Sequence, residues 1–99
     1  MGVNEFVVLA RWTARKGEEE NVGRILKLLA DATRSEAGCL QYSVHRSADD
    51  PAAYVLYERY VDEAAYQVHA ASGHFRDLAL NDGIPRLASR AREFYSVVD

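Results

Sequence analysis

The stretch CLQYSVHRSADDPAAYVLYERYV, residues 39–61, contains two candidate β-strands joined by a short turn. Residues 39–46 alternate between apolar and polar side chains, and residues 53–61 are rich in tyrosine and valine. Both patterns are typical of strands. The intervening SADDP consists of residue types that form turns. Because the connection is short, we predict an antiparallel hairpin in the middle of the chain.

The segment before this hairpin predicts one strand and one helix. Residues 6–14, FVVLARWTA, start with apolar side chains on both alternating faces, which is typical of a central strand covered on both sides. Three consecutive glutamates then mark the start of a helix, where negative charge is favourable. The helix has one apolar stripe at helical spacing, formed by Val22, Ile25, Leu26 and Leu29.

The segment after the hairpin predicts two helical pieces. Asp62 is a suitable N-cap for a helix over 63–70, and Ser72 can cap a second helical piece over 73–80. We expect the second piece to stop at the turn-forming sequence Asn81-Asp82-Gly83, with Pro85 preventing a simple continuation.

Residues 91–98, AREFYSVV, predict the fourth strand, which gives the order β-α-β-β-α-β. This order is the ferredoxin-like α+β pattern, with one antiparallel four-stranded sheet in a single domain over residues 1–99. Both helices cover one face of such a sheet, while the strands here are apolar on both faces. Since 99 residues leave no third layer, we predict that a second copy covers the other face in a homodimer.

The composition excludes several classes of function. A net charge of −3 gives no electrostatic reason to expect nucleic acid or an anionic membrane as a partner. The single cysteine, Cys39, cannot form a disulfide within the chain. The first residues contain only a four-residue apolar run, which is too short for a signal peptide or membrane helix. We therefore expect a cytoplasmic protein.

His69 and His74 lie five positions apart, on either side of Ser72-Gly73. On a regular α-helix this spacing turns the chain by about 500°, so the side chains diverge and do not match the H-E-x-x-H metal motif. With no carboxylate or thiol at ligand spacing, we expect no metal. A helix break at Ser72-Gly73 could direct both imidazoles into one cavity for acid–base chemistry. The helix termini would then favour protonated His69 and neutral His74. The alternative is that one histidine caps a helix and the other packs.

Aromatic side chains gather on the predicted strands, where most belong in the core or the dimer interface: Trp12, Tyr42, Tyr54, Tyr57, Tyr60, Phe94 and Tyr95. Buried tyrosine hydroxyls need hydrogen-bond partners, so an aromatic pocket with polar groups is a second interpretation. Glu58 lies in the middle of a strand. It either pairs with Arg11, Arg59 or Arg92, which is our preferred interpretation, or lies in a functional cavity.

Three segments resemble the antibiotic biosynthesis monooxygenase domain family, and its small quinol monooxygenase-like members in particular: SEAGCLQY (35–42), YVLYERYVDEAAYQVH (54–69) and SGHF (72–75). The specific parts are E-x-G-C, the Y-E-x-Y/W run and H-x-x-S/T-x-H-F/Y. The resemblance spans nearly the whole chain and implies a homodimeric α/β barrel with a pocket between the sheet and the second helical region. It places Trp12, Glu58, Tyr66, His69, His74 and Phe75 in that pocket, and Tyr42 is a further aromatic candidate.

The resemblance implies several activities, because the family includes cofactor-independent oxygenases of hydroquinones and anthrones, isomerases of a phosphorylated metabolite, and haem-degrading enzymes. The haem-degrading branch is least similar, since its first-strand asparagine is missing from LARWTA and its helical tryptophan falls near Tyr66. Our hypothesis is a monooxygenase without metal, flavin or other cofactor that uses dioxygen on a small phenolic substrate. His69, with His74, would remove the phenol proton.

Two alternatives remain open. The first is an isomerase of a small polar metabolite that uses the same bases, with Arg86 and Arg90 holding an anionic group. A solvated edge or dimer rim is the simpler interpretation of the basic stretch that contains Arg86, Arg90 and Arg92. The second alternative is a non-catalytic dimeric binding module in which the histidines are structural.

Overall fold

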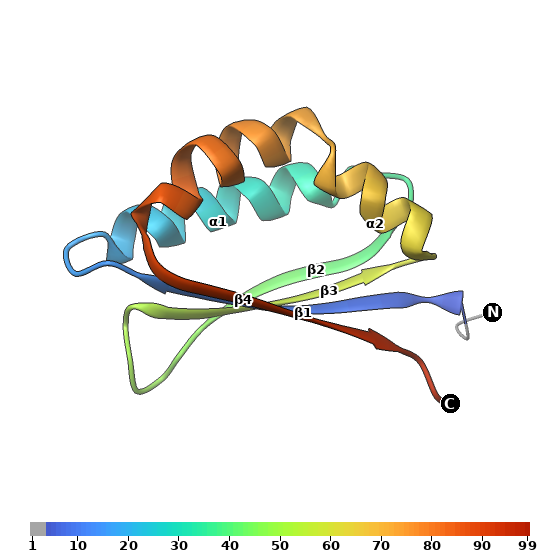
Figure 1. Ribbon diagram of the computed structural model, residues 1–99, viewed down its shortest axis with the longest axis horizontal. Coiled ribbons are helices and arrows are strands. Elements are labelled where there is room, and N and C mark those ends of the chain that lie inside the picture. Colours follow the sequence, from blue (N-terminus) through green and yellow to red (C-terminus); the bar gives the residue numbers. More distant parts are fainter. Residues whose placement is uncertain (1–3) are drawn as a thin grey trace.

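The computed structural model describes residues 4–99, which form one four-stranded antiparallel sheet with helices on one of its faces (Figure 1). The strands are β1 (Phe6–Ala14), β2 (Cys39–Arg46), β3 (Ala53–Tyr60) and β4 (Leu87–Ser96), in the spatial order β2-β3-β1-β4. The helices are α1 (Glu19–Thr33), α2 (Glu63–Ala70), η2 (Phe75–Gly83) and η3 (Ile84–Arg86). This arrangement confirms the predicted ferredoxin-like α+β fold.

Local sequence signals account for the start of both helices after the hairpin. The Asp62 side chain accepts a hydrogen bond from the backbone N–H of Ala65 at 2.9 Å, as an N-cap residue does. Ser72 accepts a bond from the backbone N–H of Phe75 at 3.2 Å and donates one to the carbonyl of His69 at 2.7 Å. Ser72 therefore ends α2 and begins η2, which is the predicted helix break.

The second helical region differs from its prediction in type and in length. Residues Phe75–Gly83 form a π-helix, and Ile84–Arg86 continue it as a 3₁₀ turn. The predicted stop at Asn81 is wrong, because Pro85 falls in the first turn of η3, where a missing N–H costs no helical hydrogen bond. Helical structure therefore continues to the residue before β4.

Strand β4 begins at Leu87 instead of residue 91 and ends at Ser96 instead of residue 98. Arg90, which the prediction left before the strand, belongs to β4. The strand lies at the edge of the sheet, where long charged side chains reach water without disturbing the pairing. All its residues after Leu87 are exposed.

The core lies between the sheet and the helices. The predicted apolar stripe of α1 is fully buried at Val22, Ile25, Leu26 and Leu29, each contributing roughly 1.5–3 kcal/mol by burial. On β3, alternate residues point inward and are all buried: Tyr54, Leu56, Glu58 and Tyr60. Glu58 stands out in this set because a carboxylate is rarely buried without a partner.

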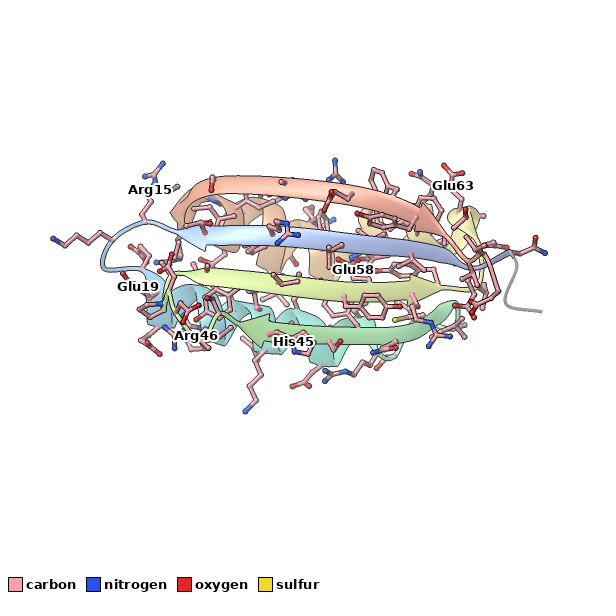
Figure 2. The ribbon with its side chains drawn as sticks, turned by 90° about the horizontal axis from the view of Figure 1, so that it is seen from below. Arg15, Glu19, His45, Arg46, Glu58 and Glu63 are labelled. Atoms are coloured by element: carbon pink, nitrogen blue, oxygen red, sulfur yellow. The ribbon has the colours of Figure 1, made fainter. Side chains whose placement is uncertain are left out.

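The other face of the sheet carries no helix within residues 4–99 (Figure 2). Its outward side chains are a mixture of apolar and charged residues. Tyr57 is half-buried, Tyr95 is 48% exposed, and Arg11 contacts Glu93 across the strands at 3.8 Å. The predicted second copy on this face stays a prediction. No helix in the described part of the chain is long and apolar enough to span a membrane.

Candidate functional site

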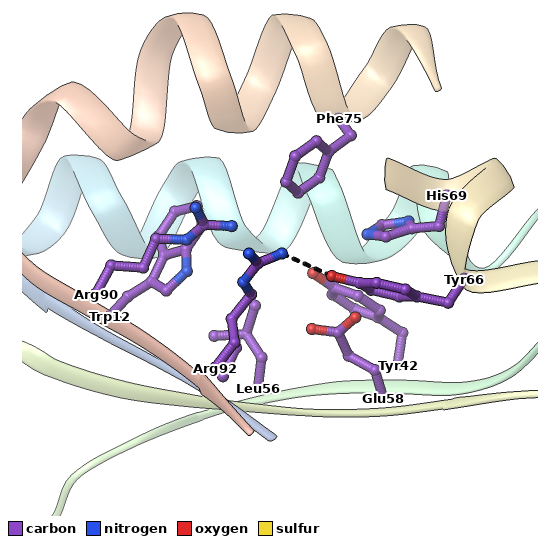
Figure 3. A pocket seen from close by; sticks show the side chains of 10 residues that line it. Trp12, Tyr42, Leu56, Glu58, Tyr66, His69, Phe75, Arg90 and Arg92 are labelled. Atoms are coloured by element: carbon purple, nitrogen blue, oxygen red, sulfur yellow. Dashed lines mark hydrogen bonds between the residues drawn. The ribbon is translucent and has the colours of Figure 1, made fainter. Parts of the chain in front are cut away.

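A narrow cavity lies between the sheet and the second helical region (Figure 3). All four strands, α2 and η2 contribute to its lining, which consists of Ala10, Trp12, Tyr42, Leu56, Glu58, Tyr66, His69, Phe75, Arg90 and Arg92. The structure therefore brings together every residue that we predicted for the site except His74. The cavity volume is about 10 Å³, which is room for about one water molecule.

Strand register explains why residues far apart in sequence share this cavity. Trp12 and Ala10 on β1 lie directly opposite Arg90 and Arg92 on β4. Paired residues of an antiparallel sheet point to the same face, and Trp12 and Ala10 are buried under the helices. Both arginines therefore lie on the helix-covered face, at its open edge.

Glu36 connects the two histidines of the predicted pair. The Nδ1 of His69 donates a hydrogen bond to Oε2 of Glu36 at 2.9 Å, and the Nε2 of His74 donates to the same oxygen at 2.5 Å. The imidazole centroids are 6.1 Å apart. The break after α2 does bring the histidines together, but they meet on a carboxylate, and His74 does not line the cavity.

Glu36 reaches the histidines because the loop after α1 packs closely on α2. Gly38 makes this approach possible, since a Cβ at this position would lie 2.5 Å from the Cβ of Ala65. Sequence reasoning missed Glu36 as a site residue. The E-x-G-C motif could have indicated it. Its glutamate, Glu36, binds the two histidines, and its glycine, Gly38, allows the loop to pack closely on α2.

His69 is 2% exposed and packs among aromatic rings. The ring centroids of Phe75, Tyr60 and Tyr42 lie 5.2, 5.5 and 5.6 Å from its own. Burial lowers the pKa of His69, although the carboxylate of Glu36 opposes this shift. The expectation that a helix terminus favours protonated His69 is therefore wrong, because burial outweighs the terminus.

Neutral His69 has one ring nitrogen to donate and one to accept. Since Nδ1 donates to Glu36, Nε2 is the acceptor, and it lies at the end of the imidazole that is turned toward the cavity (Figure 3). A buried carboxylate that fixes a histidine tautomer in this way is the arrangement of a general base.

The ligand atoms of Glu36, His69 and His74 lie within 4.8 Å of one another, so this set could hold a metal ion. The argument that no carboxylate lies at ligand spacing is wrong, because Glu36 comes from a distant part of the chain. Two histidines and one glutamate are ligands that zinc accepts. Here their donor atoms are already joined by hydrogen bonds, so we interpret the cluster as a proton relay, and the metal-free site stays a prediction.

Glu58 lies in the cavity wall and is 4% exposed. It accepts a hydrogen bond from the hydroxyl of Tyr60 at 2.7 Å. Burial raises the pKa of Glu58 to about 7, so that it is partly protonated near neutral pH. The preferred ion pair is wrong, because Arg11 and Arg59 pair with other glutamates and Arg92 donates to a tyrosine.

The three arginines before and within β4 have different environments. Arg86 pairs with Glu18 at 2.7 Å and with Asp82 at 3.0 Å, and it is not part of the cavity lining. Arg90 and Arg92 do line it. The Nη1 of Arg92 donates to the hydroxyl of Tyr66 at 2.8 Å, and this bond joins β4 to α2 within the cavity lining (Figure 3).

A second, larger hollow of about 350 Å³ lies between α1 and the β2–β3 hairpin. Of its charged side chains, Arg34 pairs with Asp31 and Arg46 pairs with Glu20, whereas Lys27 forms no ion pair within residues 4–99. Its lining contains no histidine and no buried carboxylate. Chemistry therefore favours the smaller cavity over the larger hollow as the functional site.

Comparison with known proteins identifies the family of the chain. Residues 5–79 match the family model described as antibiotic biosynthesis monooxygenase, and this segment contains Glu36, Glu58, His69 and His74. The chain belongs to the antibiotic biosynthesis monooxygenase family. The match ends before β4, so the arginines at the open edge lie outside the matched segment.

Relatives with related names and structures support the assignment. A protein of Mycobacterium tuberculosis called "Putative monooxygenase Rv0793" is 34% identical over 68 residues, which is 69% of this chain and 66% of the relative. Its solved structure has a TM-score of 0.88 at 27% identity and covers 96% of both chains. PA3566 of Pseudomonas aeruginosa has a TM-score of 0.89 at 28% identity, covering 100% of this chain and 99% of that one.

Proposed function

We propose that the protein is a cofactor-independent monooxygenase that acts on a hydroquinone or another electron-rich phenol. The observation that carries this proposal is the Glu36–His69 pair, with a neutral imidazole facing a small aromatic cavity. A phenol becomes a strong electron donor once its proton is removed. An enzyme with one well-placed base and a site that excludes water could start this chemistry without a bound redox group.

The proposed reaction begins when Nε2 of His69 takes the phenol proton. The phenolate transfers one electron to dioxygen, and the resulting radical pair combines to a hydroperoxide on the ring. Loss of water from this intermediate leaves one oxygen atom on the product, so a hydroquinone and O₂ give a hydroxyquinone and H₂O. The substrate supplies both electrons, and the imidazolium returns its proton to the peroxide anion to form the hydroperoxide, whose OH then leaves as water with the hydrogen of the same ring carbon.

The other residues of the cavity have supporting roles in this proposal. Glu36 is a positioning residue that holds the His69 tautomer and stabilises the imidazolium, and His74 donates to the same carboxylate oxygen. The ring nitrogen of Trp12 and the hydroxyl of Tyr66 are donors in the lining that could stabilise a developing oxyanion. Tyr42 and Phe75 would provide the aromatic wall around the substrate.

Oxygen uptake tests this proposal directly. The purified protein should consume one O₂ per molecule of product with a hydroquinone or anthrone substrate, after subtraction of the uncatalysed rate. His69→Ala should lower kcat roughly 10²–10⁴-fold, the usual contribution of a general base. His45→Ala is the matched control, because His45 is exposed on β2 and its side chain forms a hydrogen bond with Ser43, outside the cavity.

Three results would contradict the proposal. Equal oxygen uptake by wild type and His69→Ala would remove His69 from the reaction. Substrate turnover without oxygen uptake would point to the isomerase instead. Binding of the aromatic substrate with no turnover would point to the non-catalytic module.

The active unit in this proposal is a homodimer, with a second copy covering the free face of the sheet. Support comes from the aromatic side chains at this face, which include half-buried Tyr57 and exposed Tyr95. Light scattering should give a mass of twice the 11.1 kDa of one chain. Tyr57→Glu should shift the protein toward monomer, and a wild-type monomer at all concentrations would contradict the dimer.

A further inference from the structure

Two arginines at the open side of the cavity have no carboxylate partner. Arg90 and Arg92 are two positions apart on β4, so both point to the helix-covered face. Within residues 4–99 neither forms an ion pair, whereas six other arginines do: Arg11, Arg34, Arg46, Arg59, Arg76 and Arg86. Arg15 and Arg24 also lack an ion pair there, but neither lines the cavity.

The positive charge of this pair is not neutralised inside the cavity. Glu58 is the carboxylate in the lining, and its Oε1 is engaged by Tyr60. Partial loss of solvent, followed by the like charge of Arg92, lowers the pKa of Arg90. Two guanidinium groups that share one opening repel each other, and an anion between them would relieve this repulsion through charge-assisted hydrogen bonds.

We propose that Arg90 and Arg92 bind an anionic substituent, such as a carboxylate, on the phenolic substrate. This inference rests on the proposed function, since it describes the substrate of the same cavity. The phenolic ring would lie against Trp12 and Phe75 with its hydroxyl toward His69, and the anion would lie at the sheet edge. This orientation matches the lining, with the base at one end and the cations at the other (Figure 3).

Anion binding also explains how a substrate enters a cavity of about 10 Å³. The hydrogen bond from Arg92 to Tyr66 joins two residues of the cavity lining. An anion accepts more strongly from a guanidinium than a neutral hydroxyl does. Arg92 would therefore turn to the anion, open the cavity, and leave the Tyr66 hydroxyl available to the phenolate oxygen.

Two probes of nearly the same shape test the charge requirement. They are 2,5-dihydroxyphenylacetate, which is an anion, and 2,5-dihydroxyphenylacetamide, which is neutral. Trp12 is the single tryptophan and lines the cavity, so quenching of its fluorescence measures binding under anaerobic conditions. We expect the acid to bind about tenfold more tightly than the amide. Added salt should weaken binding of the acid alone.

Variants assign this preference to the two arginines. Arg90→Gln and Arg92→Gln should each weaken binding of the acid about tenfold and change binding of the amide less than twofold. Arg24→Gln is the charge-matched control on α1, and it should change neither. The inference is overturned if wild type binds the acid no more tightly than the amide, including the case in which it binds neither. Equal weakening by the Arg24 and Arg90 variants would also overturn it.

Oxygen uptake with the same probes separates this inference from the proposed function. Preferential binding of the acid without oxygen uptake by either probe would leave the anion site standing and refute the monooxygenase. Oxygen uptake with both probes at equal affinity would support the monooxygenase and refute the anion site.

Discussion

The two ends of the cavity are built in opposite ways. At the inner end, His69 is almost fully buried and is fixed by a hydrogen bond and by surrounding rings. At the outer end, Arg90 and Arg92 extend from an exposed edge strand, and a single hydrogen bond joins Arg92 to Tyr66. The difference suggests separate roles for the two ends. The rigid inner end would carry the catalytic base, and the adjustable outer end would admit the substrate. Changes at the inner end should therefore affect stability and turnover, and changes at the outer end should affect affinity.

The largest effect should come from Glu58 at the inner end. Its folded pKa of about 7 lies above the usual value of 4.5 for a glutamate, so its stabilising contribution is complete below pH 4.5 and is lost as the pH rises through 7. The loss corresponds to about 3 kcal/mol. Glu58→Gln should remove this decline, and urea unfolding at pH 5 and pH 8 measures it. Glu63→Gln, at an exposed position, is the control, and an unchanged decline in Glu58→Gln would refute the assignment.

Glu36→Gln should have the next largest effect, about a 30-fold decrease in kcat, or roughly 2 kcal/mol. The carboxylate raises the pKa of His69 against the effect of burial, so the variant should have a still lower pKa at His69. Because activity requires neutral His69, the acidic limb of the kcat profile should move to lower pH, with a lower plateau. A purely structural role would lower kcat without moving this limb.

Gly38→Ala should cost about 1–2 kcal/mol of stability. The added Cβ would meet the Cβ of Ala65 at 2.5 Å and push the loop that carries Glu36 away from α2. The matched control is Gly73→Ala, where the added Cβ meets only the end of the Arg76 side chain at 3.5 Å. Thermal unfolding compares the two variants. If both lose the same stability, the close approach at Gly38 does not hold the loop.

Tyr66→Phe should have the smallest effect on stability, because its hydroxyl accepts one hydrogen bond from Arg92 at the open end. We expect a change in stability below about 1 kcal/mol and a few-fold change in KM for the acidic probe. A loss of stability as large as that of Gly38→Ala would contradict the contrast between a rigid and an adjustable end.

Much of the fold could be predicted because its signals are local. The hairpin turn, the α1 stripe and the caps at Asp62 and Ser72 each depend on residues a few positions apart. The helix type of η2 could not be predicted, since the sequence pattern does not distinguish a π-helix from an α-helix. The start of β4 was missed for a related reason, because an edge strand tolerates charges that a central strand excludes.

The site was predictable where side chains follow the strand and helix pattern. Trp12, Glu58 and His69 lie on inward faces, and the structure places them in one cavity. Glu36 was missed because its partner lies 33 positions away, and no periodicity connects a loop to a distant helix. The orientation of His74 depends on the same loop, so sequence spacing alone suggested an open cavity between the histidines instead of a carboxylate.

The π-helix η2 makes the length of this segment adjustable. Each of its turns holds more residues than an α-helical turn does. Deleting one residue between Phe75 and Gly83 could be absorbed by conversion to an α-helix, without altering the sheet or α1. Such a deletion would rotate His74 and Phe75 relative to the anchored end of the segment, where Gly83 packs against Trp12. Deletion of a single codon could thus change the shape of the cavity while the sheet and α1 keep their structure.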